Sequence, residues 1–136
     1  MGFAPDQFDI LARKQKVGQA DADTVALQLY MHLDAAKRGQ GTNHAANQLA
    51  THLIAASYIA QQTKSRAFHT QITAAYNALK KASDRPTQLL DLTTGEYKQI
   101  RAAFNTYLKA LPNVQLGTMH DSMLIAQERM KCPSAT

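Results

Sequence analysis

The histidines and the single cysteine are the residues of this chain whose types could carry out chemistry. His52 lies early in the segment THLIAASYIA, residues 51–60, among small and apolar side chains that favour a helix. An imidazole can take part in group transfer, hold a metal ion or pack into a core. The neighbours of His52 in the sequence decide which of these roles is favoured.

The segment from His52 to Ser57 resembles the histidine phosphotransfer motif, which occurs on four-helix bundles of similar size. That family typically places a lysine three residues and a glycine four residues after the histidine. This chain has Ala55 and Ala56 there, which removes the charge partner of a phosphoryl group and narrows access to the imidazole. A phosphotransfer-like bundle that uses His52 is therefore a remote alternative.

The spacing of the histidines argues against a metal site. His44 and His52 are eight residues apart, which is about 12 Å along a helix, whereas zinc requires its ligand atoms within about 2.3 Å. The sequence contains no HExxH pair and no CxxC. We therefore expect no metal and no cofactor, although a site assembled across helices from His32, His52 and His69 is left open.

Nucleophilic catalysis finds little support either. Cys132 lies in the terminal segment MKCPSAT, where a positioned base is not expected, and the serines lack a GxSxG context. No GxxxxGK[ST] loop is present to bind phosphates. Residues 11–19 resemble a helix-turn-helix only superficially, because carboxylates follow the turn. The chain is expected not to be an enzyme.

Glycines and prolines divide the chain into segments with apolar residues at helical spacing. We expect an all-α, single-domain bundle of five or six helices over residues 1–136, with flexible ends at residues 1–4 and 132–136. The expected helices are residues 5–16, from 21 or 23 to 38, from 43 to about 60, from 65 to about 81, 93–111 and from 118 to 130.

The sequence predicts the junction between the third and fourth of these helices less clearly than the other boundaries. Their apolar faces are rotated by roughly 140° from each other, so one straight helix would point its two halves at different neighbours. We expect a break near residues 61–65, with Ser65 as a candidate N-cap. No glycine or proline enforces the break, so a single kinked helix over residues 44–83 is left open.

Polar residues predict where two other helices begin. Asp21 or Asp23 can accept from the free N–H groups at the start of the second helix. The segment Thr93-Thr94-Gly95-Glu96 is typical of a capping box, in which a hydroxyl and a carboxylate each satisfy a backbone N–H.

Two apolar stripes could serve either as core or as a binding surface. The methionines at 119, 123 and 130 favour core packing of the last helix, with an adaptable partner-binding face as the alternative. The second helix has a broad apolar cover that permits a homodimer. Its members are Val25, Leu27, Leu29, Tyr30, Met31 and Leu33.

The charge layout is the most informative global feature. The chain has a net charge of +5, yet residues 35–83 carry +6 because they contain six cations and no Asp or Glu. Residues 1–34 carry −2 and residues 84–136 carry +1. A basic block of this size indicates either a polyanionic partner or a solvated polar face.

Cations also form two stripes on the expected fourth and fifth helices, and such stripes could follow a phosphate backbone without reading sequence. The alternative is that each stripe is the solvent face of an amphipathic helix. The stripes are Arg66, His69, Thr73 and Lys80, and Lys98, Arg101, Asn105 and Lys109. The candidate polyanion- or partner-binding residues are Lys37, Arg38, Lys64, Arg66, His69, Lys80, Lys81, Lys98, Arg101 and Lys109.

These patterns favour a small interaction protein that binds a nucleic acid backbone, a nucleoprotein complex or an acidic protein surface. The alternative is a protein-binding inhibitor or adaptor without nucleic-acid contact, such as a bacterial, phage or mobile-element accessory protein that acts on host machinery. The lone cysteine, the lack of a signal sequence and the lack of a long apolar run favour a soluble, cytoplasmic protein with no membrane partner.

Overall fold

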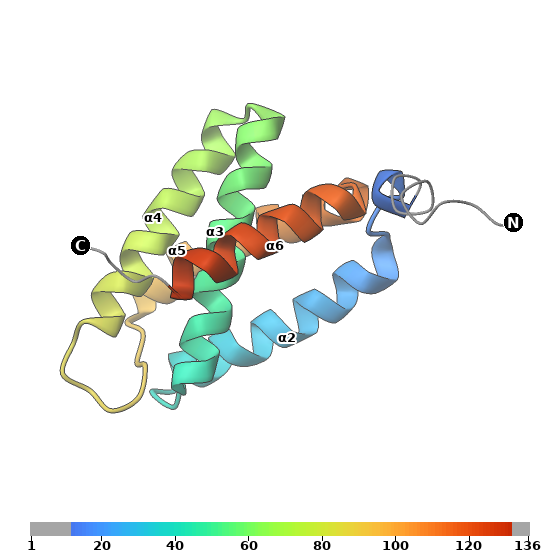
Figure 1. The fold of residues 1–136 in the computed structure, drawn as a ribbon. Coiled ribbons are helices and arrows are strands. Elements are labelled where there is room, and N and C mark those ends of the chain that lie inside the picture. Colours follow the sequence, from blue (N-terminus) through green and yellow to red (C-terminus); the bar gives the residue numbers. More distant parts are fainter. Residues whose placement is uncertain (1–11, 132–136) are drawn as a thin grey trace, which may run out of the picture.

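The chain folds into a bundle of α-helices, seen in a computed structural model that describes residues 12–131 (Figure 1). The elements are α2 (Gln19–Lys37), α3 (Asn43–Thr63), α4 (Arg66–Ser83), α5 (Thr94–Ala110), the 3-10 turn η1 (Leu111–Asn113) and α6 (Leu116–Lys131). Residues 12–131 contain no strand and only two isolated β-bridges. The expected all-α bundle is therefore confirmed.

Some expectations fall outside this range. Of the helix expected over residues 5–16, only residues 12–14 are described as helical. The ends expected to be flexible, residues 1–4 and 132–136, are not among the described residues. Among the helices that are described, none has the length and apolar character needed to cross a membrane.

Helix α3 is the centre of the bundle. Its residues 51–56 are all buried. Six consecutive residues make up more than one helical turn, so every side of the helix is buried at this level. It contacts α2, α4, α5 and α6, and Figure 1 shows α4 running beside it and α6 crossing it. Ala55 and Ala56 are fully buried within this turn, so their small side chains let the neighbouring helices approach closely.

The core has a large and a small part. The large part lies between α2, α3, α4 and α5, where Leu33, Leu53, Ile72 and Phe104 are almost completely buried. The small part lies between α3 and α6. It contains Ile54, Ala55 and Ala126, with Tyr58, Met123 and Met130 packed against them. Met119 packs against the large part. The prediction that the methionine stripe belongs to the core is confirmed.

The loop between α4 and α5 is fastened to the end of α2 and to the turn that follows it. Gly41 and Leu90 exchange two backbone hydrogen bonds of 3.0 and 2.7 Å, and the Leu92 N–H donates to the Ala36 carbonyl over 2.9 Å. A Cβ on residue 41 would lie 2.8 Å from the Leu90 Cβ, so this approach requires glycine. These bonds hold the beginning of α5 next to the end of α2.

Two helix starts follow the sequence pattern. The Thr93 hydroxyl accepts from the Glu96 N–H, and the Glu96 carboxylate accepts from the Thr93 N–H, so the expected capping box is present. The Thr42 hydroxyl caps α3 by accepting from the Ala45 N–H.

The expectation that Asp21 or Asp23 caps α2 is wrong. The helix begins at Gln19, after Gly18 with a φ of 84°, and no side chain caps it. Instead, the Gly18 N–H donates to the Pro112 carbonyl over 3.1 Å. A long-range backbone bond therefore fixes this start, and local sequence does not reveal it. Helix α6 also begins earlier than expected, at Leu116.

The break between α3 and α4 is confirmed, and it occurs without glycine or proline. Lys64 ends α3 in the left-handed conformation, with φ 57° and ψ 24°. The Ser65 hydroxyl then accepts from the Phe68 N–H over 3.3 Å and caps α4. The two helices run as an antiparallel pair from this point (Figure 1).

We predict that Lys64→Gly stabilises the protein. The left-handed conformation costs a residue with a Cβ about 1–2 kcal/mol, and glycine avoids this cost. Part of the gain is offset because glycine loses more conformational entropy when the chain folds. The expected gain in the free energy of unfolding is up to about 1 kcal/mol, measured by urea denaturation. Lys80→Gly, inside α4, is the control and should lose about 1 kcal/mol. Equal losses in both variants would contradict the prediction.

Candidate polyanion-binding surface

The fastened α4–α5 loop places a cation of α2 against an aromatic ring of α5. Lys37 lies in the last turn of α2, and its Nζ is 4.5 Å from the centroid of the Tyr97 ring. An ammonium in this position is attracted by the negative face of the ring. The contact joins two helices that are 60 residues apart in the sequence at these positions.

A guanidinium and a second ring continue this arrangement. The Arg101 Cζ is 5.9 Å from the centroid of Tyr97 and 6.0 Å from that of Tyr30. Its Nη1 also donates to the Tyr97 hydroxyl over 3.1 Å. The Tyr30 hydroxyl in turn donates to the Asn105 side-chain oxygen. Cations and rings therefore alternate across the α2–α5 boundary.

The outer side of α5 adds two further cations to this surface. Lys98 and Lys109 are exposed and share a side of the helix with Arg101 and Asn105. We call this surface the α2–α5 face. Its members are Tyr30, Lys37, Tyr97, Lys98, Arg101, Asn105 and Lys109.

The cations of the α2–α5 face have no carboxylate partner among residues 12–131. Ion pairs in that range join Arg13 to Asp121, Arg38 to Asp34 and Arg85 to Glu96. None of the four face cations takes part in them. Their charges are therefore available to an anion that approaches from solvent.

The remaining candidate residues lie elsewhere. Arg38 is exposed and forms a 2.9 Å ion pair with Asp34 one turn earlier on α2. Lys64, Arg66 and His69 are exposed at the tip of the α3–α4 pair. Lys80 is exposed near the other end of α4, about 21 Å along the axis from Arg66.

The two predicted cationic stripes do not form one surface. Thr73, in the α4 stripe, lines a groove with residues of α3 and α6, including Ser57 and Arg129. Arg101, in the α5 stripe, contacts Tyr30 on α2 instead. Each stripe is exposed as expected, but they border different helices.

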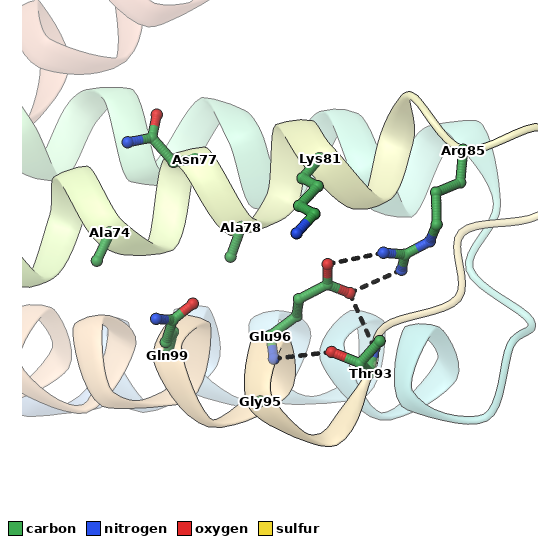
Figure 2. A pocket seen from close by; sticks show the side chains of 9 residues that line it. All are labelled: Ala74, Asn77, Ala78, Lys81, Arg85, Thr93, Gly95, Glu96 and Gln99. Atoms are coloured by element: carbon green, nitrogen blue, oxygen red, sulfur yellow. Dashed lines mark hydrogen bonds and ion pairs between the residues drawn. The ribbon is translucent and has the colours of Figure 1, made fainter.

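A separate cleft of about 520 Å³ lies between α4 and α5 (Figure 2). Lys81 lines it together with Arg85 and Glu96, and Figure 2 shows the Lys81 side chain directed toward α5. The Glu96 carboxylate accepts from both terminal nitrogens of Arg85, over 2.8 and 2.7 Å. Lys81 is thus the candidate residue that lies beside an existing ion pair.

The Arg85–Glu96 pair shifts both groups toward their charged forms. The hydrogen bonds from Arg85, assisted by the Thr93 N–H, lower the pKa of Glu96 to about 2. The same hydrogen bonds raise the pKa of Arg85 above its ordinary value. Because Glu96 also completes the capping box, this pair fastens the start of α5 to the end of α4.

His52 is part of the core. It is 6% exposed, and its Nδ1 lies 3.0 Å from the Tyr107 hydroxyl. Burial, reinforced by the nearby His32, lowers the pKa of His52 to about 4, and burial raises the pKa of Tyr107. Both side chains are therefore neutral at pH 7. This geometry supports a structural role, and we do not propose phosphotransfer.

The other histidines do not complete a metal site. His32 and His44 approach with ring centroids 5.5 Å apart. However, no group of three or more His, Cys, Asp or Glu side chains within residues 12–131 has a geometry that could hold a metal ion. His69 lies on a different helix from His44 and His52, on α4.

The two tyrosines of the α2–α5 face are not among the candidate residues that the sequence patterns indicate. Tyr30 enters there only as part of the apolar cover of the second helix. Tyr97 precedes Arg101 by four residues, a spacing that places them side by side on a helix and could have signalled their contact. No local signal could have shown that Tyr30 and Lys37 join them, because those contacts depend on how α2 packs against α5.

We predict that acid destabilises the protein through His52. In the unfolded chain its pKa has the ordinary value of 6.5, and in the folded chain it is about 4. Below pH 6.5 the unfolded state therefore binds more protons, and stability falls as the pH is lowered toward 4, by roughly 3 kcal/mol in total. Between pH 7 and pH 5, the loss of unfolding free energy measured by urea denaturation should be smaller for His52→Gln than for the parent chain. His120→Gln, exposed on α6, is the control; an identical pH dependence in all three proteins would contradict the prediction.

A second prediction concerns Glu96. Removing its charge in Glu96→Gln should lower the free energy of unfolding at pH 7 by roughly 1–3 kcal/mol, because Arg85 loses its charged partner and one of the two carboxylate oxygens that accept from it. Since the pKa of Glu96 is depressed from 4.5 to about 2, the contribution is complete above pH 4.5 and disappears as the pH falls toward 2. Thermal denaturation at several pH values measures this, with Glu128→Gln on α6 as the control. A Glu96→Gln deficit that is independent of pH would argue against the ion pair.

Comparison with protein-family models, with curated proteins and with solved structures found no match. The function is therefore inferred from the surface itself.

Proposed function

We propose that this chain binds a nucleic acid through its phosphate backbone, using the α2–α5 face. The observation that carries the proposal is the alternation of Lys37, Tyr97, Arg101 and Tyr30 across two helices. In the described part of the chain, none of the cations in this face has a carboxylate within ion-pairing distance. A surface of unpaired cations with rings between them matches the needs of a nucleic acid chain.

Each residue type of the face has a role in such binding. Lysine ammonium groups neutralise phosphates as point charges, and the guanidinium of Arg101 can donate two parallel hydrogen bonds to one phosphate. Tyr30 and Tyr97 are half-buried against the core. Their rings hold Lys37 and Arg101 in position through cation–π contacts. The amide of Asn105 adds a polar contact.

The proposal is one of binding and not of catalysis. Phosphate contacts position a nucleic acid without reading its sequence, so we expect affinity to be independent of sequence and to fall steeply with salt. The net charge of +5 adds a general attraction for polyanions. A cytoplasmic location belongs to the proposal, because a chain with one cysteine suits reducing surroundings.

The competing function is a protein-binding adaptor or inhibitor without nucleic-acid contact. Its support is a groove of about 210 Å³ between α3, α4 and α6. Leu53, Ile54, Ile72 and Tyr76 line this groove, and the exposed Ile125 lies on α6. A groove whose lining combines apolar side chains with Ser57, Thr73 and Arg129 can accept a side chain of a protein partner.

The test is binding to fluorescently labelled, random-sequence single-stranded DNA and RNA, followed by fluorescence anisotropy. Between about 50 and 200 mM NaCl, affinity should fall steeply. The double variant Lys98→Glu/Arg101→Glu should weaken binding at least about 10-fold, and Lys98→Ala should lower the slope of log K against log salt by about 1.

Arg66→Glu/Lys80→Glu is the matched control, since it makes the same charge change on the α4 stripe. The control should retain affinity within about 3-fold. No binding at about 50 mM salt would reject the proposal in favour of the adaptor. Equal losses in both double variants would show that net charge alone, and not the α2–α5 face, governs binding.

A further inference from the structure

Helices α4 and α6 both pack on α3, but within residues 12–131 they do not pack against each other. This arrangement leaves a groove of about 210 Å³, which has α3 as its floor and α4 and α6 as its walls, and which we call the α3–α4–α6 groove. Leu53 and Ile54 line its floor, and Ile72 of α4 lies beside them. All three side chains are buried. The deepest part of the groove is therefore apolar.

The volume of the α3–α4–α6 groove fits an apolar body of about one ring. An apolar cavity of about 150 Å³ can hold one benzene molecule. Sites for drug-sized ligands begin at about 300 Å³. A groove of about 210 Å³ therefore has room for one ring and one small polar group, but not for a larger ligand.

Arg129 of α6 is the only charged residue among those that line this groove in the described chain. Its Cζ lies 5.5 Å from the centroid of the Tyr58 ring, so a cation–π contact holds the guanidinium against α3. Arg129 takes no part in the ion pairs of residues 12–131. A guanidinium is charged at every physiological pH and can donate two parallel hydrogen bonds to one carboxylate.

Carboxylates that could compete for Arg129 are absent from two of the three helices around the groove. Helices α3 and α4 contain no Asp or Glu, because both lie within the acid-free block of the sequence. On α6, Asp121 is paired with Arg13. Glu128 precedes Arg129 by one residue and is therefore rotated about 100° from it around the helix. An anion that enters the groove thus meets a cation with no carboxylate beside it in the described chain.

Two hydroxyl groups limit the number of charges that a ligand can carry. The Ser57 hydroxyl donates to the Ile54 carbonyl over 2.7 Å, and the Thr73 hydroxyl donates to the His69 carbonyl over 3.0 Å. Their protons are therefore already used, and neither hydroxyl can donate to a second anionic group. The lining matches a ligand with a single carboxylate.

We propose that the α3–α4–α6 groove binds a small monocarboxylate whose apolar body is about the size of one ring. The carboxylate pairs with Arg129, and the apolar body lies on the buried floor. Charge-assisted hydrogen bonds and the removal of apolar surface from water both stabilise this complex. No residue that lines the groove belongs to the α2–α5 face, so this binding is independent of the proposed nucleic-acid binding.

Benzoate is the probe, titrated into the isotope-labelled full chain and followed by NMR. We expect saturable shifts at Ser57, Thr73 and the Arg129 side chain, with a Kd of about 1 mM or below, as suits a very small ligand. Benzyl alcohol keeps the ring without the charge, and acetate keeps the charge without the ring. Each should bind at least about 10-fold more weakly than benzoate.

Arg129→Gln should raise the Kd for benzoate at least about 10-fold, because glutamine keeps a polar donor but loses the charge. Arg66→Gln is the matched control, since it makes the same charge change outside the groove, and it should leave the Kd within about 2-fold. Both arginines are exposed, so circular dichroism should show that both variants stay folded. Thr73→Phe, a second variant, places a ring at the exposed wall of the groove and should also weaken binding without a change of charge.

No saturable shift at the groove with up to about 10 mM benzoate would overturn the proposal, and so would shifts confined to the α2–α5 face. An Arg129→Gln variant with the affinity of the parent chain would overturn it as well. Equal affinities for benzyl alcohol and benzoate would reject the carboxylate in favour of an apolar side chain of a protein partner.

Discussion

The complete burial of the middle of α3 is the constraint on which the rest of the structure depends. Residues 51–56 have neighbours on every side, so no charged side chain can occupy this turn. The small side chains of Ala55 and Ala56 set how closely the surrounding helices approach. Four helices contact α3. Helix α3 contains no Lys or Arg, and the basic residues of the described chain lie on the helices and loops around it.

Polar groups inside this framework are retained in two different ways. His52 and Tyr107 are buried together as neutral partners, and burial shifts both pKa values toward the neutral forms. Glu96 is kept as an anion because Arg85 and the Thr93 N–H surround its carboxylate. The first pair fixes α3 against α5, and the second fixes α5 against the end of α4. Neither pair uses the cations of the α2–α5 face, which have no carboxylate partner among residues 12–131.

Local patterns in the sequence predicted most of the helices, because caps and apolar periodicity act over a few residues. The capping box at Thr93 and the Ser65 cap are examples. Patterns failed where long-range contacts decide the structure. The start of α2 depends on the bond from Gly18 to Pro112, 94 residues away in the sequence. The candidate site was only partly predictable for the same reason. Its cations were recognised, but the rings between them and the separation of the two stripes depend on helix packing.

The basic block of the sequence and the basic surface of the fold consist of largely different residues. Residues 35–83 contain no carboxylate, yet the fold separates their cations, with Lys64 and Arg66 at the tip of the α3–α4 pair and Lys37 at the end of α2. The surface that gathers unpaired cations takes only Lys37 from this block. Its other cations follow Glu96, whose carboxylate is occupied by Arg85. An acid-free stretch of sequence therefore forms a basic surface only where packing brings its charges together, and carboxylates nearby in sequence do not cancel the charge of that surface when they are already paired.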